Sequence, residues 1–161
     1  MINLFYPSSF LPHKNHYVLF SHKINNCLVE LNIKLYLTID SPSKLQLSNI
    51  VCLGRLSKAE CTSHLLSSAG LFWISSTESF GLPLFEAAKL YKPIIALDKP
   101  YVKSLFEDST YKICDLSDHE IINTLVDFAA DHEASCLAIP SLKFSFNPPS
   151  NFLKEFHNAL I

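Results

Sequence analysis

The chain has 161 residues, of which 48% are hydrophobic, and this length and composition predict one globular domain. Its formal net charge is −2 and it contains no run of basic residues, which argues against a nucleic-acid partner. No apolar run approaches the ~20 residues that span a bilayer, and three glycines are too few for the Gly-rich fingerprint of a nicotinamide or flavin site.

Short apolar runs in the first third of the chain predict three strands and one long helix. Ile2–Tyr6 has the pattern of a buried strand, and a turn with two prolines follows it. Ile33–Ile39 and Ile50–Gly54 are the next predicted strands, separated by a polar loop. The helix opens at His13–His16 and is expected to continue for about five turns, because apolar residues recur at helical spacing at Tyr17, Phe20, Ile24, Cys27, Leu28 and Leu31.

The rest of the chain alternates predicted helices with three further strands. Ser57–Glu60 and Ser117–Glu120 both have the capping-box pattern that begins a helix. The inner faces of these two helices are predicted at Cys61, Leu65, Leu66 and Ala69, and at Ile121, Ile122, Leu125, Val126 and Ala129. The remaining predicted elements are the strands Leu71–Ile74, Pro93–Leu97 and Tyr111–Cys114, a helix from Gly81 to Leu90, and a short helix that ends at Phe106.

Six strands that alternate with helices predict an α/β fold, a Rossmann-like doubly wound parallel sheet with helices on both faces. We expect residues 1–135 to form this domain and residues 136–161 to add a C-terminal extension with an amphipathic helix at Asn151–Ile161. Ligands of such sheets bind beyond the carboxyl ends of the strands. Lys14, Gly54–Arg55 and the loop at residues 75–80 all map to that edge, which is therefore the expected site.

The main functional signal is a pair of glutamates around the start of one predicted helix. Glu78 precedes the helix and Glu86 lies inside it, while Gly81 and Pro83 occupy its first turn. A helix N-terminus offers unpaired N–H groups and about half a positive charge, which suits a phosphate group. Glu86 lies roughly 7 Å along the axis from Gly81, so a diphosphate there would have a carboxylate on either side to accept hydrogen bonds from hydroxyls. A nucleotide sugar has this layout; the structural alternative is a buried helix start with two solvated glutamates.

Residues 78–87, Glu-Ser-Phe-Gly-Leu-Pro-Leu-Phe-Glu-Ala, followed by Pro93-Ile94-Ile95-Ala96, resemble the E-x7-E signature of retaining glycosyltransferases of the GT-B fold, family GT4. Lys14-Asn15-His16 resembles a second motif of the family, in which a Gly-Arg pair precedes the lysine. Ser8 and Ser9 stand where that pair is expected, so one of two phosphate-binding cations is missing. The resemblance is to the C-terminal, donor-binding domain, one half of a GT-B fold.

The resemblance implies roles for single residues. Glu78 would hold the hydroxyls of the donor sugar and Glu86 those of the ribose, and Lys14 would stabilise the leaving diphosphate. The N–H groups around Phe80, Gly81 and Leu82, and the hydroxyl of Ser9, would contribute to the same phosphate site. Gly54 and Arg55 would lie beside the nucleobase; a plain surface position for Arg55 is the open alternative.

The resemblance also implies a function and partners. The domain would bind a nucleotide diphosphate sugar, a UDP-sugar first and GDP-mannose next, for transfer of a hexose or N-acetylhexosamine to a glycan or polyprenyl-diphosphate-linked acceptor in O-antigen, lipopolysaccharide or capsule synthesis. No metal cofactor is expected, because no Asp-x-Asp motif is present. The acceptor domain of such an enzyme would precede this chain, so we expect a fragment or a short gene product that binds donor weakly and transfers nothing alone.

Two alternatives to the transferase stay open at this point. The first is a non-catalytic nucleotide-binding or interaction module of the same fold; the second, less in keeping with the E-x7-E spacing, is a sugar-nucleotide epimerase. The place of the C-terminal helix is also open: it either packs on this domain or crosses to the acceptor domain.

Five cysteines without a C-x-x-C pair indicate a reduced, cytoplasmic protein, with peripheral contact to the inner face of the membrane left to the full-length enzyme. The N-terminus lacks the basic region of a signal peptide. A metal hypothesis on His13, His16, His22, Cys61 and His64 finds no second ligand pair at zinc-site spacing.

Overall fold

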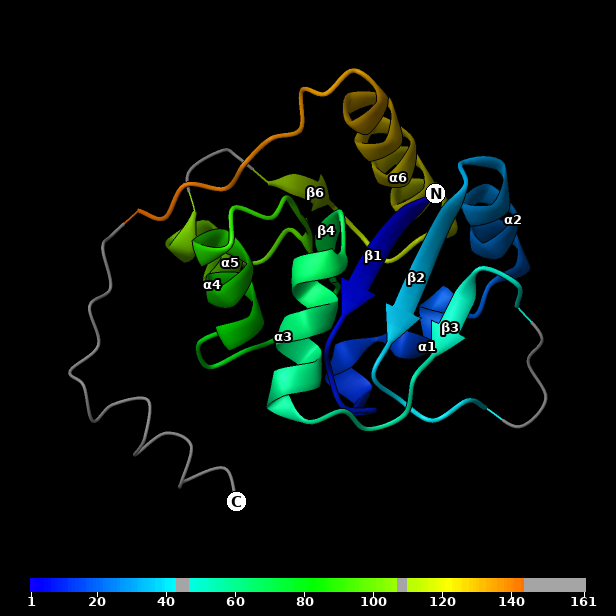
Figure 1. Ribbon diagram of the computed structural model, residues 1–161, viewed down its shortest axis with the longest axis horizontal. Coiled ribbons are helices and arrows are strands. Elements are labelled where there is room, and N and C mark those ends of the chain that lie inside the picture. The colour runs from blue at the N-terminus through cyan, green and yellow to red at the C-terminus, as the bar shows by residue number, and fades with distance from the viewer. Residues whose placement is uncertain (43–46, 107–109, 144–161) are drawn as a thin grey trace.

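The computed structural model describes residues 1–42, 47–106 and 110–143, and its centre is one six-stranded parallel sheet (Figure 1). The strand order is β3-β2-β1-β4-β5-β6, and every paired neighbour is parallel. The chain therefore runs outward from β1 to one edge and returns to build the other, which confirms the predicted doubly wound fold. The strands are β1 (Ile2–Tyr6), β2 (Ile33–Leu37), β3 (Ile50–Cys52), β4 (Gly70–Trp73), β5 (Ile94–Leu97) and β6 (Tyr111–Ile113).

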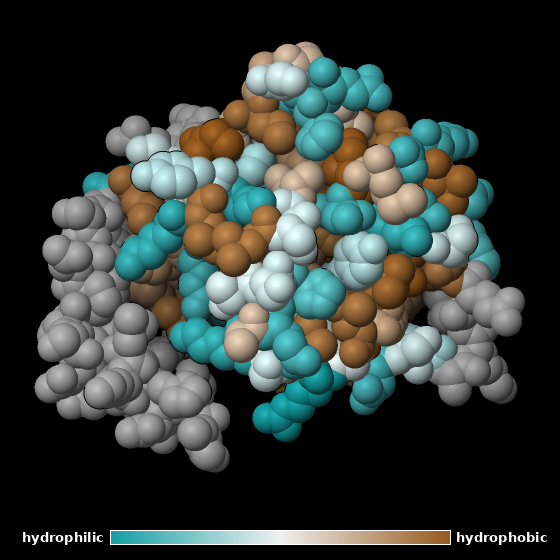
Figure 2. Space-filling model, in the orientation of Figure 1, coloured by the Kyte–Doolittle hydropathy of each residue, from teal (hydrophilic) through white to brown (hydrophobic). Residues whose placement is uncertain are grey.

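Helices cover both faces of the sheet, as right-handed crossovers between parallel strands require. On one face α2 (His22–Glu30) packs against α6 (Asp118–Glu133). The crossovers that build the second half of the sheet carry α3 (Lys58–Ser67), α4 (Leu82–Lys89) and α5 (Pro100–Leu105), and Figure 1 shows α3 in front of the sheet. Hydrophobic and hydrophilic residues are interspersed over this face of the molecule (Figure 2).

The core is most continuous along β1, β4 and β5, three of the four inner strands of the sheet. Every residue of β4 and β5 is buried, which explains why their sequences are continuous apolar runs without alternation. The largest fully buried side chains of these strands are Leu4, Phe5, Tyr6, Phe72 and Trp73. Trp73 ends β4 and Tyr6 ends β1, so the core reaches up to the carboxyl edge where the ligand site is expected.

The predicted five-turn helix after β1 is wrong: the segment forms three short pieces, η1 (Pro12–Lys14), α1 (His16–Leu19) and α2. Asn15 has a left-handed backbone (φ 56°), which ends the first piece, and the Ser21 hydroxyl caps α2 by accepting a hydrogen bond from the Lys23 N–H. Tyr17, predicted to face the core, is 63% exposed. The apolar spacing did not reveal these breaks, because polar residues make them.

Other predictions on helices are confirmed in part. Ser57 and Glu60 form the full reciprocal capping box at the start of α3. At α6 only half of the box forms, because the Ser117 N–H donates to Asp115 rather than to Glu120. Leu66 and Val126, predicted on inner faces, are exposed, whereas Leu65, Ile121, Leu125 and Ala129 are buried as expected.

The C-terminal extension is described only as far as Lys143. Its Lys143 N–H donates to the Leu105 carbonyl, and Leu142 forms an antiparallel bridge with Phe106, so this part packs on the end of α5. The predicted helix Asn151–Ile161 lies outside the described residues. Within the described ranges, no helix combines the length and the apolar character needed to cross a membrane.

Gly70→Ala should destabilise the sheet, because a Cβ at this position would lie 2.9 Å from the Pro93 carbonyl oxygen and 3.3 Å from Phe128 Cζ. Overpacking of this kind costs about 1–3 kcal/mol. Urea denaturation measures the loss. Ser67→Ala, on the exposed side of α3, is the control and should change the free energy of unfolding by less than about 0.5 kcal/mol. A Gly70→Ala protein as stable as this control would contradict the close packing of β4 on β5.

Candidate functional site

Two adjoining cavities lie at the carboxyl ends of the central strands. The first, which we call the Lys14 cavity, has a volume of about 350 Å³, and the second, the Arg55 cavity, about 590 Å³. They share the loop after β1 as a common wall (Pro7, Ser8 and Ser9). Together they form an elongated site, with one end at the start of α4 and the other beside the loops after β2 and β3.

A buried ion pair occupies the floor of the Lys14 cavity. The ammonium group of Lys14, the last residue of η1, pairs with the carboxylate of Glu78 in the loop after β4. Their side chains are only 10% and 15% exposed, and the Lys14 Nζ lies 4.8 Å from the centre of the Trp73 ring. Removing one partner would leave a largely desolvated charge, so the pair persists until another charged group replaces one side. Lys14 is therefore already paired with a carboxylate at the place where the resemblance implies that it stabilises a diphosphate.

Asn15 fixes Lys14 in this place. Its side-chain amide donates to the Ile74 carbonyl and to the Ser76 hydroxyl, both at 2.7 Å. The Ser76 N–H in turn donates to the His13 carbonyl at 2.8 Å, and the hydroxyl of Tyr6 donates to the Lys14 carbonyl. These bonds join η1 to the loop after β4, so the residues that carry the two charges are held together through the backbone as well.

His16, the last residue of the Lys-Asn-His motif, lines neither cavity but contacts Ser8, which lines both. It is 1% exposed, its ring stacks on Tyr6 with centres 4.8 Å apart, and its Nε2 lies 3.0 Å from the Ser8 hydroxyl oxygen. Burial, with the nearby charge of Lys14, lowers the pKa of His16 to about 4, so the ring is neutral at pH 7. A neutral imidazole holds one proton, and this limits what it can offer to Ser8.

The start of α4 forms one wall of the Lys14 cavity. Gly81 is the N-cap residue, with a left-handed backbone (φ 71°), and no side chain caps the helix there. Gly81 and Leu82 line the cavity together with Phe80, so the positive end of the helix dipole is at the cavity wall. A bound anion would occupy the place that a capping side chain usually takes.

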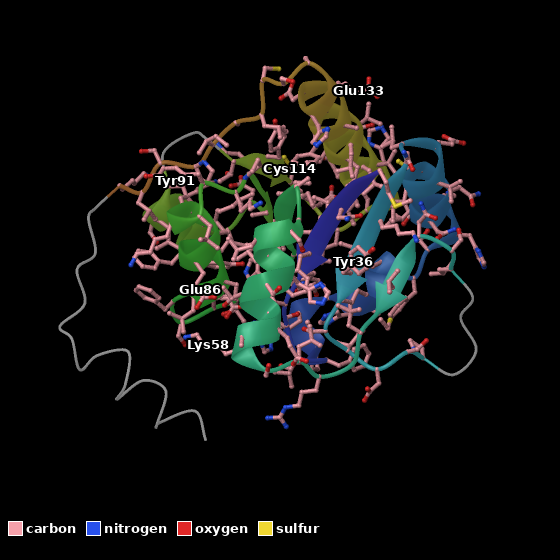
Figure 3. The ribbon with its side chains drawn as sticks, viewed as in Figure 1. Tyr36, Lys58, Glu86, Tyr91, Cys114 and Glu133 are labelled. Carbon is pink, nitrogen blue, oxygen red and sulfur yellow. The ribbon has the colours of Figure 1, made fainter. Side chains whose placement is uncertain are left out.

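Glu86 lies outside this cavity, contrary to the expectation that two carboxylates face one bound diphosphate. Its side chain is 43% exposed and pairs with Lys58 at 3.7 Å. Figure 3 labels both residues, Glu86 on α4 and Lys58 on α3. Five residues beyond Gly81, the helix has turned more than once, and this position faces α3 rather than the mouth of α4. Glu86 also lies close to Cys61, whose thiol pKa is raised mainly by burial and further by Glu86. Cys61 lines the Arg55 cavity, so Glu86 lies near that second cavity but does not line it.

Arg55 is exposed and lines the second cavity with Thr38 and Asp40. Gly54 has a left-handed backbone (φ 72°), and a Cβ there would lie 3.3 Å from the Asp40 carboxylate. This glycine therefore lets the loops after β2 and β3 approach each other closely. Ser9 is exposed and lines both cavities.

The structure thus brings together Lys14, Glu78 and the start of α4, places Arg55 and Ser9 in the adjoining cavity, and leaves Glu86 outside the lining of both cavities. Sequence reasoning missed Trp73, Asn15 and His16 as parts of the site. The position of Trp73 was a usable signal, because the last residue of a central strand faces the ligand edge. The roles of Asn15 and His16 come from contacts with distant segments, which no local pattern displays.

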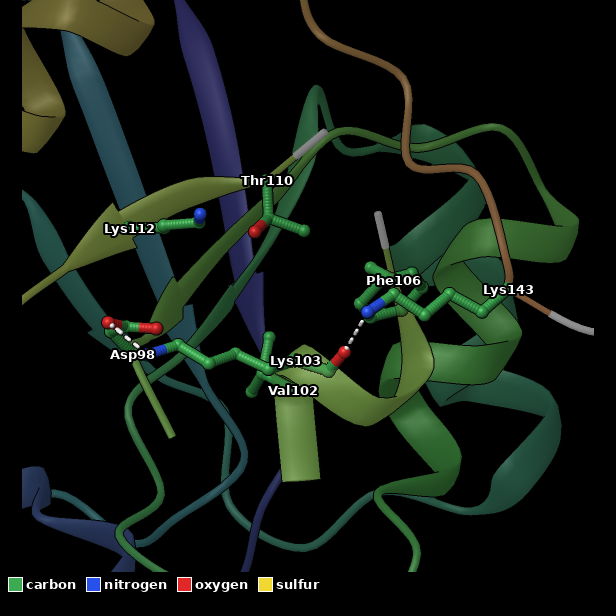
Figure 4. A pocket seen from close by; sticks show the side chains of 7 residues that line it. All are labelled: Asp98, Val102, Lys103, Phe106, Thr110, Lys112 and Lys143. Carbon is green, nitrogen blue, oxygen red and sulfur yellow. Dashed lines mark hydrogen bonds and ion pairs between the residues drawn. The ribbon is translucent and has the colours of Figure 1, made fainter. Parts of the chain in front are cut away.

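A further cavity of about 350 Å³ lies between α5 and the sheet edge, and its polar groups are largely engaged (Figure 4). Lys103 pairs with Asp98 at 2.9 Å, and the Lys143 ammonium donates to the Lys103 carbonyl at 2.7 Å. The chain on both sides of this cavity continues outside the described residues, so we do not assign it a ligand. In the part of the chain that the structure describes, no three His, Cys, Asp or Glu side chains are grouped so that they could hold a metal ion.

Comparison by sequence finds no matching family model and no matching curated protein. Comparison by structure finds GT-B glycosyltransferases. TarM from S. aureus, in complex with UDP, has a TM-score of 0.67 at 16% identity, over 83% of this chain and 29% of TarM. HepE from Anabaena, in complex with UDP-glucose, has a TM-score of 0.67 at 16% identity, over 85% of this chain and 41% of HepE. The catalytic domain of cholesterol-α-glucosyltransferase from Helicobacter pylori has a TM-score of 0.66 at 12% identity, over 84% of this chain and 89% of that domain.

These likenesses show the fold: the chain has the Rossmann-like architecture of GT-B glycosyltransferases. It spans less than half the length of TarM and HepE.

Asn15→Gly should lower the free energy of unfolding by about 1–3 kcal/mol, because buried acceptors on the loop after β4 lose their donor. Asn15→Ala should cost about 1–2 kcal/mol more, since alanine also resists the left-handed backbone. Asn32 has a similar backbone (φ 51°) but is exposed, so Asn32→Gly is the matched control and should stay within about 0.5 kcal/mol in urea denaturation. Equal losses at both asparagines would rule out a special role for Asn15.

His16 should make stability depend on pH. Its folded-state pKa of about 4 lies below its ordinary value of 6.5, so the unfolded chain binds more protons between these values. The free energy of unfolding should therefore fall as pH drops through this window, by at most about 1.4 kcal/mol per pH unit. Urea denaturation of the wild type and His16→Gln over this range isolates the effect, and the variant should show the shallower dependence. Parallel curves would contradict a buried neutral histidine.

Proposed function

We propose that this chain is the C-terminal, donor-binding domain of a retaining GT4-type glycosyltransferase. The observation that carries the proposal is the Lys14–Glu78 pair at the uncapped start of α4, in a cavity that continues into a second one lined by Arg55. In this proposal the cation and the helix dipole would bind a diphosphate, the carboxylate beside them would accept hydrogen bonds from sugar hydroxyls, and the second cavity would hold the nucleoside.

Donor binding would proceed as an exchange of partners. The diphosphate replaces the Glu78 carboxylate at Lys14, and the released carboxylate accepts hydrogen bonds from the sugar hydroxyls. The N–H groups at the start of α4 and Lys14 are then positioned for the charge that develops on the leaving diphosphate. In transfer, the bond from the anomeric carbon to the diphosphate breaks, the acceptor hydroxyl bonds to that carbon on the same face, and its proton passes to the leaving phosphate.

The nucleoside would occupy the Arg55 cavity. Arg55 and Gly54 would lie beside the base, and Glu86, near Cys61 of this cavity, would exchange Lys58 for the ribose hydroxyls. The Lys58 contact is exposed and 3.7 Å long, so it is a weak competitor. TarM, HepE and the pneumococcal O-GlcNAc transferase GtfA were each solved with UDP or a UDP-sugar, which supports a UDP-sugar donor, with GDP-mannose second.

In this proposal the donor gives a hexose or N-acetylhexosamine to a glycan or polyprenyl-diphosphate-linked acceptor in O-antigen, lipopolysaccharide or capsule synthesis. The acceptor would be held by an N-terminal GT-B domain of the intact enzyme, at the cytoplasmic face of the membrane and without a metal cofactor. The chain corresponds to 29% of TarM and 41% of HepE, which is in keeping with one domain of a larger enzyme.

The second candidate is a non-catalytic nucleotide-binding module. It is favoured by the Lys14–Glu78 ion pair, which neutralises the cation of the phosphate site, and by Ser8 and Ser9 in place of the second cation. A module of this kind would bind a nucleotide and make no distinction between UDP and a UDP-sugar.

Calorimetric titration of the chain with UDP, UDP-N-acetylglucosamine and GDP-mannose tests the proposal. Lys14→Ala should weaken UDP binding by about tenfold to a hundredfold, since a buried charge-assisted hydrogen bond is lost. Lys23→Ala, on the exposed surface of α2, is the matched control and should bind as the wild type does. Glu78→Ala should leave UDP binding intact, because Lys14 is freed, but should remove any preference for the UDP-sugar.

Equal affinities of the wild type for UDP and UDP-N-acetylglucosamine, unchanged in Glu78→Ala, would favour the module. No binding of any of the three nucleotides at millimolar concentration would refute both readings of the site.

A further inference from the structure

Ser8 is a buried polar residue, only 8% exposed, and yet it lines both cavities. Its backbone groups are engaged: the N–H donates to the Tyr6 carbonyl at 3.1 Å, and the carbonyl accepts from the Thr38 hydroxyl at 3.1 Å. The residue is therefore fixed at its main chain, and the side-chain hydroxyl is the group that can serve a ligand.

The direction of the Ser8 hydroxyl depends on which nitrogen of His16 carries the proton. The Ser8 oxygen lies 3.0 Å from Nε2, while Nδ1 is buried without a partner among the described residues. If the proton were on Nδ1, a buried N–H would be unsatisfied, and such donors are rarer in proteins than unpaired acceptors. The proton is better placed on Nε2, which then donates to the Ser8 oxygen and leaves the serine proton free to point elsewhere.

We propose that Ser8 donates its hydroxyl proton to the diphosphate of the donor, and that His16 is the positioning residue that holds Ser8 in this orientation. The inference rests on the proposed function and adds to it a residue that stands in for the missing second cation. The nearby Tyr6 hydroxyl oxygen can accept the proton of the Ser8 hydroxyl. A charged diphosphate oxygen is a stronger acceptor and would take the place of Tyr6.

The surroundings explain why a neutral donor suits this place. Lys14 already puts a positive charge near His16, and the Ser8 side chain is nearly enclosed, so a second desolvated cation would cost more than a hydroxyl. A buried donor that is already oriented needs little ordering when the ligand binds. Ser8, oriented by His16, thus gives the phosphate site a second hydrogen-bond donor without a second positive charge.

The tautomer of His16 is the first test and needs no ligand. Nitrogen-15 NMR of the full chain at neutral pH, with His16→Gln to assign the signal, should show the proton on Nε2. A proton on Nδ1 would overturn the proposal, because Ser8 would then donate to His16 and have no proton for a phosphate.

Binding of UDP compared with uridine is the second test. Ser8→Ala and His16→Leu should each weaken UDP binding by about tenfold or more and leave uridine binding unchanged. The double variant should lose little beyond the single ones, since both remove the same contact. His16→Gln keeps an N–H donor near the position of Nε2 and should restore most of the affinity. Ser104→Ala, an exposed serine on α5, is the matched control.

The outcomes separate this inference from the proposed function. If UDP binds and Lys14→Ala weakens it while Ser8→Ala does not, the inference fails and the proposed function stands. If neither UDP nor a UDP-sugar binds the wild type, both fail. A loss in His16→Leu that His16→Gln does not restore, in a protein that unfolds at the same urea concentration, would remove His16 as the positioning residue.

Discussion

The left-handed backbone of Asn15 is the constraint on which the site depends. It ends η1 directly after Lys14 and starts α1 at His16. Lys14 therefore reaches Glu78, while His16 contacts Ser8. Its amide then ties this corner to the loop after β4, which carries Glu78. Without this corner a continuous helix would run past the sheet edge, and the cation, the carboxylate and the buried histidine would have no common frame.

The ion pair between Lys14 and Glu78 has two consequences, one for stability and one for the proposed ligand. It lines the Lys14 cavity beside Trp73 and compensates two largely buried charges, which stabilises the domain. In the proposed function, the pair would also reserve both charges for a ligand that carries an anion next to hydroxyl groups. An anion alone would satisfy Lys14 and leave Glu78 without its partner, whereas a nucleotide sugar would satisfy both.

The sequence was sufficient for the fold, because apolar runs that alternate with helix starts predicted the six parallel strands. It also mapped Lys14, Gly54–Arg55 and the loop at residues 75–80 to the carboxyl edge of the sheet, where the structure has them. It was insufficient where a contact between distant segments decides the outcome. The pairing of Lys14 with Glu78 spans 64 positions, and the direction of Glu86 follows from how α4 packs beside α3. Asn15 broke the expected long helix through bonds to residues 59 and 61 positions away.

Trp73 offers the most direct measurement of the central claim, that a diphosphate takes Lys14 from Glu78. It is the single tryptophan of the chain, and the Lys14 ammonium lies over its ring. Titration with UDP should change the Trp73 emission in a saturable way, whereas uridine, which absorbs the same light but lacks phosphate, should not, and Lys14→Ala should abolish the change. UDP binding detected by calorimetry with no response from Trp73 would contradict the account.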